Sequence, residues 1–239
     1  MKYIFRRLFA LYLIIVFLPV VLTLTLLTAI LTILFSLTGD HKWCYIPARI
    51  WARLICALAF LRVRVRGKEN YAPDKSYIFV ANHQSILDIF LIYGWLNNRF
   101  KWIMKKELRS IPFVGAACEA AGHIFIDRSS GIRAKKSIEK AKERLQHGAS
   151  VVIFPEGTRT HDGNVGQFKR GAFRIAQDIH LPIIPITIKG AFEAMPYNSL
   201  NINPGRLEMI IHPPVNIDEL TDDALSRLMA KTHDIISNK

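Results

Sequence analysis

The feature that most constrains this chain is a long apolar stretch close to its N-terminus. No charged residue occurs over the 32 positions from Leu8 to Gly39. A helix of about 20 apolar residues crosses the hydrocarbon core of a bilayer, so this stretch is long enough for one span and too short for two. A cleaved signal peptide has an apolar core of only about 7–15 residues, and Ser36-Leu37-Thr38 offers it no good cleavage site. We therefore predict a retained membrane element.

A second apolar segment follows at residues 43–60. Arg49 and Arg53 interrupt it and share one helix face because they are four positions apart. Trp43 and Trp51 suit the headgroup level of a membrane. We predict an interfacial helix or the return arm of a helical hairpin; the alternative is a helix packed on the rest of the protein.

The charge of the chain indicates an anionic partner. Among its 239 residues are 32 Lys and Arg against 19 Asp and Glu, for a net charge of +13. Nucleic acid, anionic lipid headgroups and phosphorylated substrates all fit such a surface. The apolar N-terminus favours lipid, and no nucleic-acid-binding motif is present, so no nucleic acid partner is expected. The cysteine count of three is odd and lacks C-x-x-C spacing, which argues against a disulfide framework or zinc site.

The rest of the chain alternates between strand and helix patterns. This alternation predicts an α/β fold with a mixed, largely parallel sheet flanked by helices. We divide the chain into N-terminal membrane-anchoring helices over 1–60 and a catalytic domain over 61–239. Strands are expected over 61–66, 77–81, 124–126, 150–154, 183–189 and 206–212, and helices over 86–96, 113–121, 132–146, 169–178 and 218–236. Ligands of such sheets bind beyond the carboxyl ends of the strands.

One polar cluster at a strand end combines a histidine with an aspartate. His83 follows the apolar run 77–81, and Asp88 lies one turn inside the next helix, for which Ser85 is the expected N-cap. A folded-back turn brings the carboxylate to one imidazole nitrogen and leaves the other free to take a proton. No protein nucleophile is evident, so the attacking hydroxyl can belong to the substrate. The alternative is a histidine that only caps the helix beside a solvated aspartate.

Two further clusters carry cations. Arg128 follows the strand 124–126, where a guanidinium can hold a phosphate; the alternative is a surface arginine paired with Asp127. In the second cluster Pro155 ends a strand, Gly157 allows a tight turn, and Glu156 and Arg159 are expected to point into one space. The alternative is an ordinary turn with an exposed ion pair.

The order of these clusters resembles a known family. N-H-x-x-x-x-D at 82–88, G-x-x-F-I-D-R at 122–128, F-P-E-G-T-R at 154–159 and the apolar strand around Pro185 follow one another as in the 1-acylglycerol-3-phosphate (lysophosphatidic acid) acyltransferases of bacterial type. The segments Lys105-Lys106-Glu107-Leu108 and Phe168-Lys169-Arg170-Gly171-Ala172-Phe173 also match typical stretches of this family. The resemblance covers about residues 60–215, without departure at the defining positions.

The resemblance implies a role for each matching residue. His83 would be the general base and Asp88 its orienting partner. Lys105, Arg128 and Arg159 would bind the phosphate of the lysolipid, while Glu156 and Gly157, with Thr158 beside them, would shape the acceptor site. The donor would be acyl-CoA or acyl-carrier protein, the acceptor lysophosphatidic acid and the product phosphatidic acid, with no cofactor and no metal.

Other interpretations keep part of this picture. The same chemistry on a lyso-aminolipid or lysophospholipid is one, and a non-catalytic lipid-binding protein with a relic site is another. We predict a location at the cell inner (cytoplasmic) membrane among membrane lipids, with the catalytic domain on the cytoplasmic face. A single span with the N-terminus in the cytoplasm would place the catalytic domain on the opposite face of the membrane. The predicted location therefore requires either a helical hairpin that enters the membrane and returns to the same face, or an N-terminus outside the cytoplasm.

Overall fold

The described part of the chain is organised around a mixed sheet. The computed structural model describes residues 2–39, 43–127, 129–130, 133, 149–199, 201–217 and 221–238. The strand order is β1-β7-β6-β2-β5-β3-β4. Only the β6–β7 pair is antiparallel, which confirms the mixed, largely parallel sheet. The strands are β1 Leu61–Arg66, β2 Ile78–Ala81, β3 Phe100–Lys105, β4 Ile124–Ile126, β5 Ser150–Ile153, β6 Ile183–Lys189 and β7 Gly205–Ile211.

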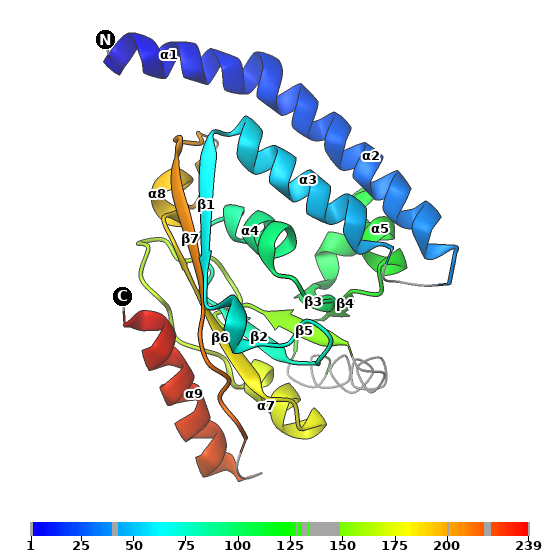
Figure 1. Cartoon of the computed structure of the whole chain (residues 1–239), viewed down its shortest axis with the longest axis vertical. Coiled ribbons are helices and arrows are strands. Elements are labelled where there is room, and N and C mark those ends of the chain that lie inside the picture. The colour runs from blue at the N-terminus through cyan, green and yellow to red at the C-terminus, as the bar shows by residue number, and fades with distance from the viewer. Residues whose placement is uncertain are drawn as a thin grey trace.

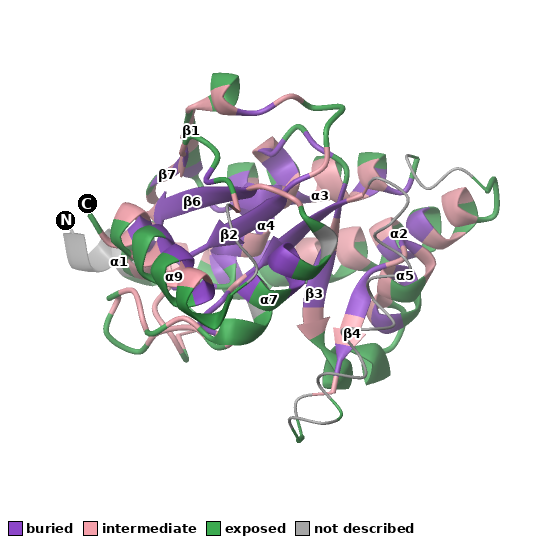
Figure 2. Cartoon of the chain, turned by 90° about the horizontal axis from the view of Figure 1, so that it is seen from below, coloured by how far each residue is buried: buried purple, intermediate pink, exposed green. Residues whose placement is uncertain are grey.

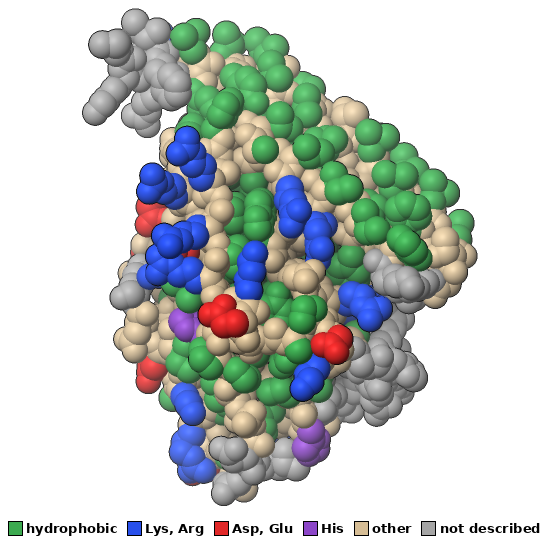
Figure 3. Space-filling view, viewed as in Figure 1, with side chains coloured by type: hydrophobic (Ala, Val, Ile, Leu, Met, Phe, Trp, Pro, Cys, Tyr) green, Lys and Arg blue, Asp and Glu red, His purple; other side chains and the backbone are tan. Residues whose placement is uncertain are grey.

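The apolar N-terminal stretch forms one long helical rod. It comprises α1 (Lys2–Tyr12), a π-helical turn (Leu13–Phe17) and α2 (Leu18–Ser36), which lie along one side of the molecule (Figure 1). Residues Arg7–Ser36 are long and apolar enough to cross a membrane, and only 17% of their most apolar window is buried. Hydrophobic side chains are frequent on the visible face of the part Arg7–Ser36 of this rod (Figure 3). A core helix of a water-soluble protein would instead be mostly buried.

The second apolar segment packs on the folded domain. It forms α3 (Tyr45–Leu58), which contacts both α2 and α4 (Leu87–Trp95). Arg53 Nε donates to the Gly94 carbonyl at 2.8 Å and Arg49 Nη2 to that of Leu96 at 3.4 Å, so both arginines bind carbonyls at the C-terminal end of α4.

Trp51, which we predict at the headgroup level, also makes contacts inside the protein. Its ring packs on Phe90, with centroids 4.8 Å apart, and its indole N–H donates to Thr25 Oγ1 at 3.0 Å. Trp51 therefore joins α3 to α4 and α2, whereas Trp43 remains 45% exposed.

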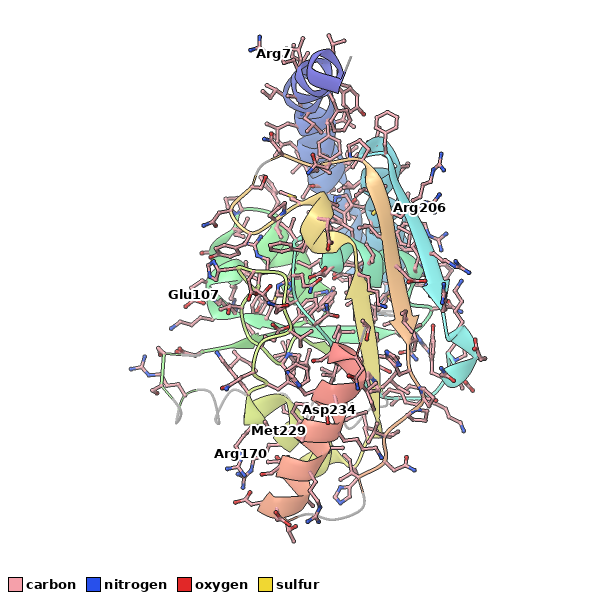
Figure 4. The ribbon with its side chains drawn as sticks, turned by 90° about the vertical axis from the view of Figure 1, so that its left-hand side faces the viewer. Arg7, Glu107, Arg170, Arg206, Met229 and Asp234 are labelled. Atoms are coloured by element: carbon pink, nitrogen blue, oxygen red, sulfur yellow. The ribbon has the colours of Figure 1, made fainter. Side chains whose placement is uncertain are left out.

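Helices cover both faces of the sheet. Strand β2 divides its side chains between two apolar clusters: Phe79 packs with α3 and α4, and Ile78 packs with α7 (Arg170–Ile179) and α9 (Asp222–Ser237). The strands are accordingly buried between the helices (Figure 2). Arg7 on α1 and Arg170 on α7 lie at opposite ends of the molecule (Figure 4), so the rod and the α7–α9 layer are well separated.

Strand β1 forms one edge of the sheet. Its Arg62, Arg64 and Arg66 are exposed, and Arg66 Nε lies 2.8 Å from Glu208 Oε1 on β7. Arg206, the register partner of Arg62, points outward at the same edge (Figure 4). Basic side chains therefore concentrate along β1 and β7, next to the apolar rod (Figure 3).

Most predicted elements are confirmed within a residue or two, with the following exceptions. Strand β3 and the short helix α8 (Ala191–Ala194) were not predicted. Helix α4 begins at Leu87 with Ile86 as its N-cap, so Ser85 is not the N-cap. The helix predicted over 132–146 lies outside the described residues, apart from the single residue Arg133.

Candidate active site

The turn between β2 and α4 brings His83 and Asp88 together. His83 Nδ1 lies 2.9 Å from Asp88 Oδ2. The backbone N–H groups of Gln84 and Ser85 donate to the same oxygen at 2.7 and 2.9 Å. Asp88 is fully buried, and these three contacts hold its Oδ2 atom in place. The carboxylate fixes the ring so that Nε2 faces away from it.

The His83 ring is also held by an aromatic side chain that directly follows β5. It stacks on Phe154 with centroids 3.9 Å apart and an interplanar angle of 8°. Phe154 in turn stacks on Trp102 of β3 at 5.4 Å. The His83 side chain is 16% exposed, so the ring is supported on one face and still reaches solvent.

Glu156 connects the loop that follows β5 to the turn between β2 and α4 that holds His83. Its Oε1 accepts from the His83 backbone N–H at 2.8 Å, and its Oε2 accepts from the Gly166 N–H at 2.8 Å. Burial raises the pKa of this carboxyl above its ordinary value, while the two backbone N–H groups act in the opposite direction. Glu156 thus holds the backbone at His83 in place. The sequence predicts that Glu156 and Arg159 point into one space, but the Glu156 carboxylate instead binds these two backbone N–H groups.

A cavity of about 540 Å³ opens in front of His83. Its size is in the range of small-molecule sites. Lys105, Gly157, Thr158 and Arg159 line it together with His83. The rest of the wall is mostly apolar and comes from α2, α3, α4, α5 (Val114–Ala120) and β3, through residues that include Ala29, Ala48, Ile89, Ala117 and Ile103.

The cations at this cavity differ in their pairing. In the described part of the chain, no hydrogen bond or ion pair engages the side-chain nitrogens of Lys105 or Arg159. Lys106 instead binds Asp127 at 2.8 Å, and that contact holds the pKa of Asp127 well below its usual range. Arg128 lies outside the described residues. Lys105 and Arg159 therefore remain available for an anionic ligand.

Gly157 is favoured by its backbone conformation, and a lysine side chain lies close to it. Its φ of +78° is unfavourable for other residues, and a Cβ there would lie 2.9 Å from Lys169 Nζ. Lys169 was not a predicted site residue, although it belongs to a stretch (168–173) that matches the family. It places another ammonium group beside the loop that carries Thr158 and Arg159.

His123 is a buried histidine beside this cavity, and the sequence pattern gives it no structural role. Its Nε2 lies 2.6 Å from Tyr93 Oη, and its Nδ1 accepts from the Trp102 backbone N–H at 3.3 Å. Burial lowers the pKa of His123 from 6.5 to about 3. The ring is therefore neutral and structural, and no spacing rule identified it because its partners come from α4 and β3.

The arrangement suits a proton-transfer reaction on a phosphate-bearing substrate. An imidazole held at Nδ1 by a buried carboxylate presents Nε2 as a base. Guanidinium and ammonium groups in the same cavity suit a phosphate, and the apolar wall suits hydrocarbon.

Sequence comparison defines the class of protein. The family model described as "Acyltransferase" matches residues 62–189, which include His83, Asp88 and residues 154–159. The chain therefore belongs to the acyltransferase family.

Individual relatives narrow the comparison further. The chain is 35% identical over 193 residues to the Arabidopsis thaliana protein "1-acyl-sn-glycerol-3-phosphate acyltransferase LPAT1, chloroplastic", covering 79% of this chain and 54% of that one. It is 32% identical to the Saccharomyces cerevisiae 1-acyl-sn-glycerol-3-phosphate acyltransferase, covering 86% and 69%. The first three curated relatives are longer proteins, of whose length the chain covers 54–64%.

A solved structure shares the whole architecture. The chain resembles the 1-acyl-sn-glycerophosphate (LPA) acyltransferase PlsC from Thermotoga maritima, with a TM-score of 0.83 and 27% identity over 100% of this chain and 95% of that one. The mixed α/β fold predicted from the sequence is thus shared with this structure.

Proposed function

We propose that the protein is a 1-acylglycerol-3-phosphate O-acyltransferase. It transfers a fatty acyl group from acyl-CoA or acyl-carrier protein to the sn-2 hydroxyl of 1-acylglycerol-3-phosphate and forms phosphatidic acid. One observation carries the proposal: His83, which is paired with the buried Asp88, lines the same largely apolar cavity as Lys105 and Arg159. The names of the relatives point to the same reaction.

His83 acts as the general base in this reaction. Nε2 takes the proton of the acceptor hydroxyl while its oxygen attacks the thioester carbonyl carbon. The C–S bond then breaks, and the imidazolium returns the proton to the leaving thiolate. Asp88 stabilises the imidazolium and keeps the Nδ1 proton in place.

Positioning supplies much of the rate. A thioester is already activated, and holding two reactants in line can lower a barrier by roughly 7–11 kcal/mol. Lys105 and Arg159 bind the acceptor phosphate, with Thr158 beside them and Gly157 and Glu156 shaping the loop. We also propose that Arg128 binds this phosphate, and this assignment rests only on the sequence motif 122–128.

The N-terminal helices connect this site to the membrane. Residues of α2 and α3 line the cavity, so hydrocarbon can pass between a bilayer and the site without crossing water. We assign residues 1–60 to membrane anchoring and residues 61–239 to catalysis. The proposed location is the inner membrane, with the site on the cytoplasmic face.

An acceptor panel tests the proposed function. Membranes containing the wild-type protein are given an acyl thioester and either lysophosphatidic acid, a lysophospholipid or a lyso-aminolipid, and products are identified by mass spectrometry. We expect phosphatidic acid as the main product. Arg159→Glu should raise the KM for lysophosphatidic acid about 10- to 100-fold, because a charge-assisted contact becomes a repulsion. A preference for a phosphate-free acceptor, or an unaffected KM, would reject the assigned substrate.

A further inference from the structure

Arg159 has an aromatic partner from a distant part of the chain. Its Cζ lies over the ring of Tyr197, 4.9 Å from the centroid. Both residues line the cavity in front of His83. Tyr197 lies beyond the residues 62–189 that the family model matches, so family membership assigns it no role.

The contact leaves the guanidinium ready for an anion. A cation over a ring is attracted to the π face, and this attraction uses none of the N–H donors. Within the described residues, no hydrogen bond or ion pair holds those donors. Arginine is a flexible side chain whose ordering costs entropy on binding, and a ring that already restrains it reduces that cost.

Tyr197 is itself fixed from two sides. The His161 ring packs against it with centroids 4.1 Å apart and an interplanar angle of 64°. The loop that carries Tyr197 is held at Met195, whose carbonyl accepts from Ser85 Oγ at 2.8 Å, and at Ala194, whose carbonyl accepts from the Asn203 N–H at 2.8 Å.

The Ser85 contact links this loop to the catalytic turn. Ser85 belongs to the segment 82–88 that holds His83 and Asp88, and its backbone N–H already donates to Asp88. Gln84 of the same turn binds the Gly163 carbonyl at 2.5 Å, in the loop that carries Arg159 and His161. Hydrogen bonds from the side chains of Ser85 and Gln84 to backbone carbonyls thereby connect the turn that holds His83 to the loops that carry Tyr197 and Arg159.

From this geometry we propose that Tyr197 is a positioning residue that holds Arg159 for the phosphate of the acceptor lipid. The inference rests on the proposed function for the identity of the anion. Tyr197 acts through Arg159 and does not take part in proton transfer. It therefore sets the affinity for the phosphate-bearing acceptor and leaves the chemical step and the acyl donor unaffected.

Steady-state kinetics with lysophosphatidic acid and acyl-CoA test the proposal in the full-length protein. We expect Tyr197→Leu to raise the KM for lysophosphatidic acid about 2- to 30-fold, the range of a cation–π contact, with kcat and the KM for acyl-CoA nearly unchanged. Tyr197→Phe, which keeps the ring, should restore most of the affinity. Trp95→Leu removes a similar contact, between Arg53 and Trp95 at 5.7 Å, away from the cavity, and should not change this KM.

A double-mutant cycle separates positioning from packing. In an Arg159→Gln background, Tyr197→Leu should change the KM less than twofold, because the side chain it restrains is gone. An undiminished effect in that background, or equal damage from Tyr197→Phe and Tyr197→Leu, would overturn the proposal.

A measurement without turnover distinguishes the two hypotheses. Phenylglyoxal modifies accessible guanidinium groups, and peptide mass spectrometry reports its rate at Arg159. Tyr197→Leu should accelerate this modification and Tyr197→Phe should not; equal rates in all three proteins would reject the restraint. A wild-type protein that shows the restraint but does not acylate lysophosphatidic acid would reject only the proposed function.

Discussion

Two histidines on the wall of one cavity have opposite surroundings. His83, after β2, bonds to a charged carboxylate and is partly exposed. His123, before β4, is buried against the hydroxyl of Tyr93 and a backbone N–H. A carboxylate partner stabilises the imidazolium, whereas burial without an anion disfavours it. The neighbouring groups of each imidazole, and not its presence in the cavity wall, therefore decide which ring can act as a base.

The largest expected effect comes from removing His83. Replacing it with alanine should lower kcat about 10²- to 10⁴-fold, the usual contribution of a general base. The protein should remain folded, but the midpoint of thermal unfolding should fall by a few degrees, because the ring stacks on Phe154 and bonds the buried carboxylate of Asp88. Radiolabelled acyl transfer and scanning calorimetry measure the two quantities. His233→Ala on α9 is the matched control, and comparable activity of His83→Ala and this control would contradict the assignment.

The carboxylate partner should matter somewhat less. Asp88→Asn keeps the shape but removes the charge that stabilises the imidazolium, so we expect kcat to fall about 10- to 100-fold. Asp74→Asn, at an exposed turn, serves as control in the same thiol-release assay. Full activity of Asp88→Asn would show that the charge beside Nδ1 is dispensable.

For His123 the expected effect is on stability and depends on pH. Its pKa is 6.5 in ordinary surroundings and about 3 in the fold, so between these values the unfolded chain binds more protons and acid destabilises the protein. The loss approaches about 1.4 kcal/mol per pH unit below 6.5. His123→Leu removes this dependence, and at pH 7 it costs about 1–3 kcal/mol because its polar partners lose their bonds. Urea unfolding at pH 5 and pH 7 measures both; equal losses on acidification in the two proteins would refute the pKa assignment.

The smallest expected effect comes from the hydroxyl of Tyr93. Burial holds the pKa of Tyr93 well above its ordinary value, so the group is a neutral hydroxyl. Tyr93→Phe should cost about 1 kcal/mol of unfolding free energy, the net value of one hydrogen bond. The same urea titrations report it, and Tyr12→Phe, which removes the part-buried hydrogen bond from the Tyr12 hydroxyl to the Leu58 carbonyl at 2.9 Å, gives the value of a comparable bond elsewhere in the protein. No loss relative to the wild-type protein would mean that the His123 contact contributes nothing.

The sequence predicts elements well where local patterning decides them. The alternating run Leu61–Arg66 and the buried run Ile183–Lys189 match β1 and β6 residue for residue. Strand β3 escaped prediction because Lys101 and Lys105 interrupt its apolar residues. Lys101 Nζ donates to the Ala121 carbonyl beyond α5, a partner that only the tertiary structure supplies.

The site was predictable to the extent that its residues are close in sequence. His83 and Asp88 share one turn, so their spacing was sufficient. The contacts of Glu156 with the His83 backbone and of Phe154 with the His83 ring exist because β2 and β5 are neighbours in the sheet. Tyr197 approaches Arg159 from a loop after β6. Strand order is a long-range property, and periodicity along the chain does not encode it.

The arginines of β1 have a consequence for how copies of the molecule meet one another. An uncovered edge strand offers unpaired backbone groups to any other strand that approaches. Arg62, Arg64 and Arg66 place a positive charge at every second position of this edge, so a second copy that approached edge to edge would meet like charges along its whole length. Within the described residues, the protein can thus keep this sheet edge without a strand partner and still resist pairing through it.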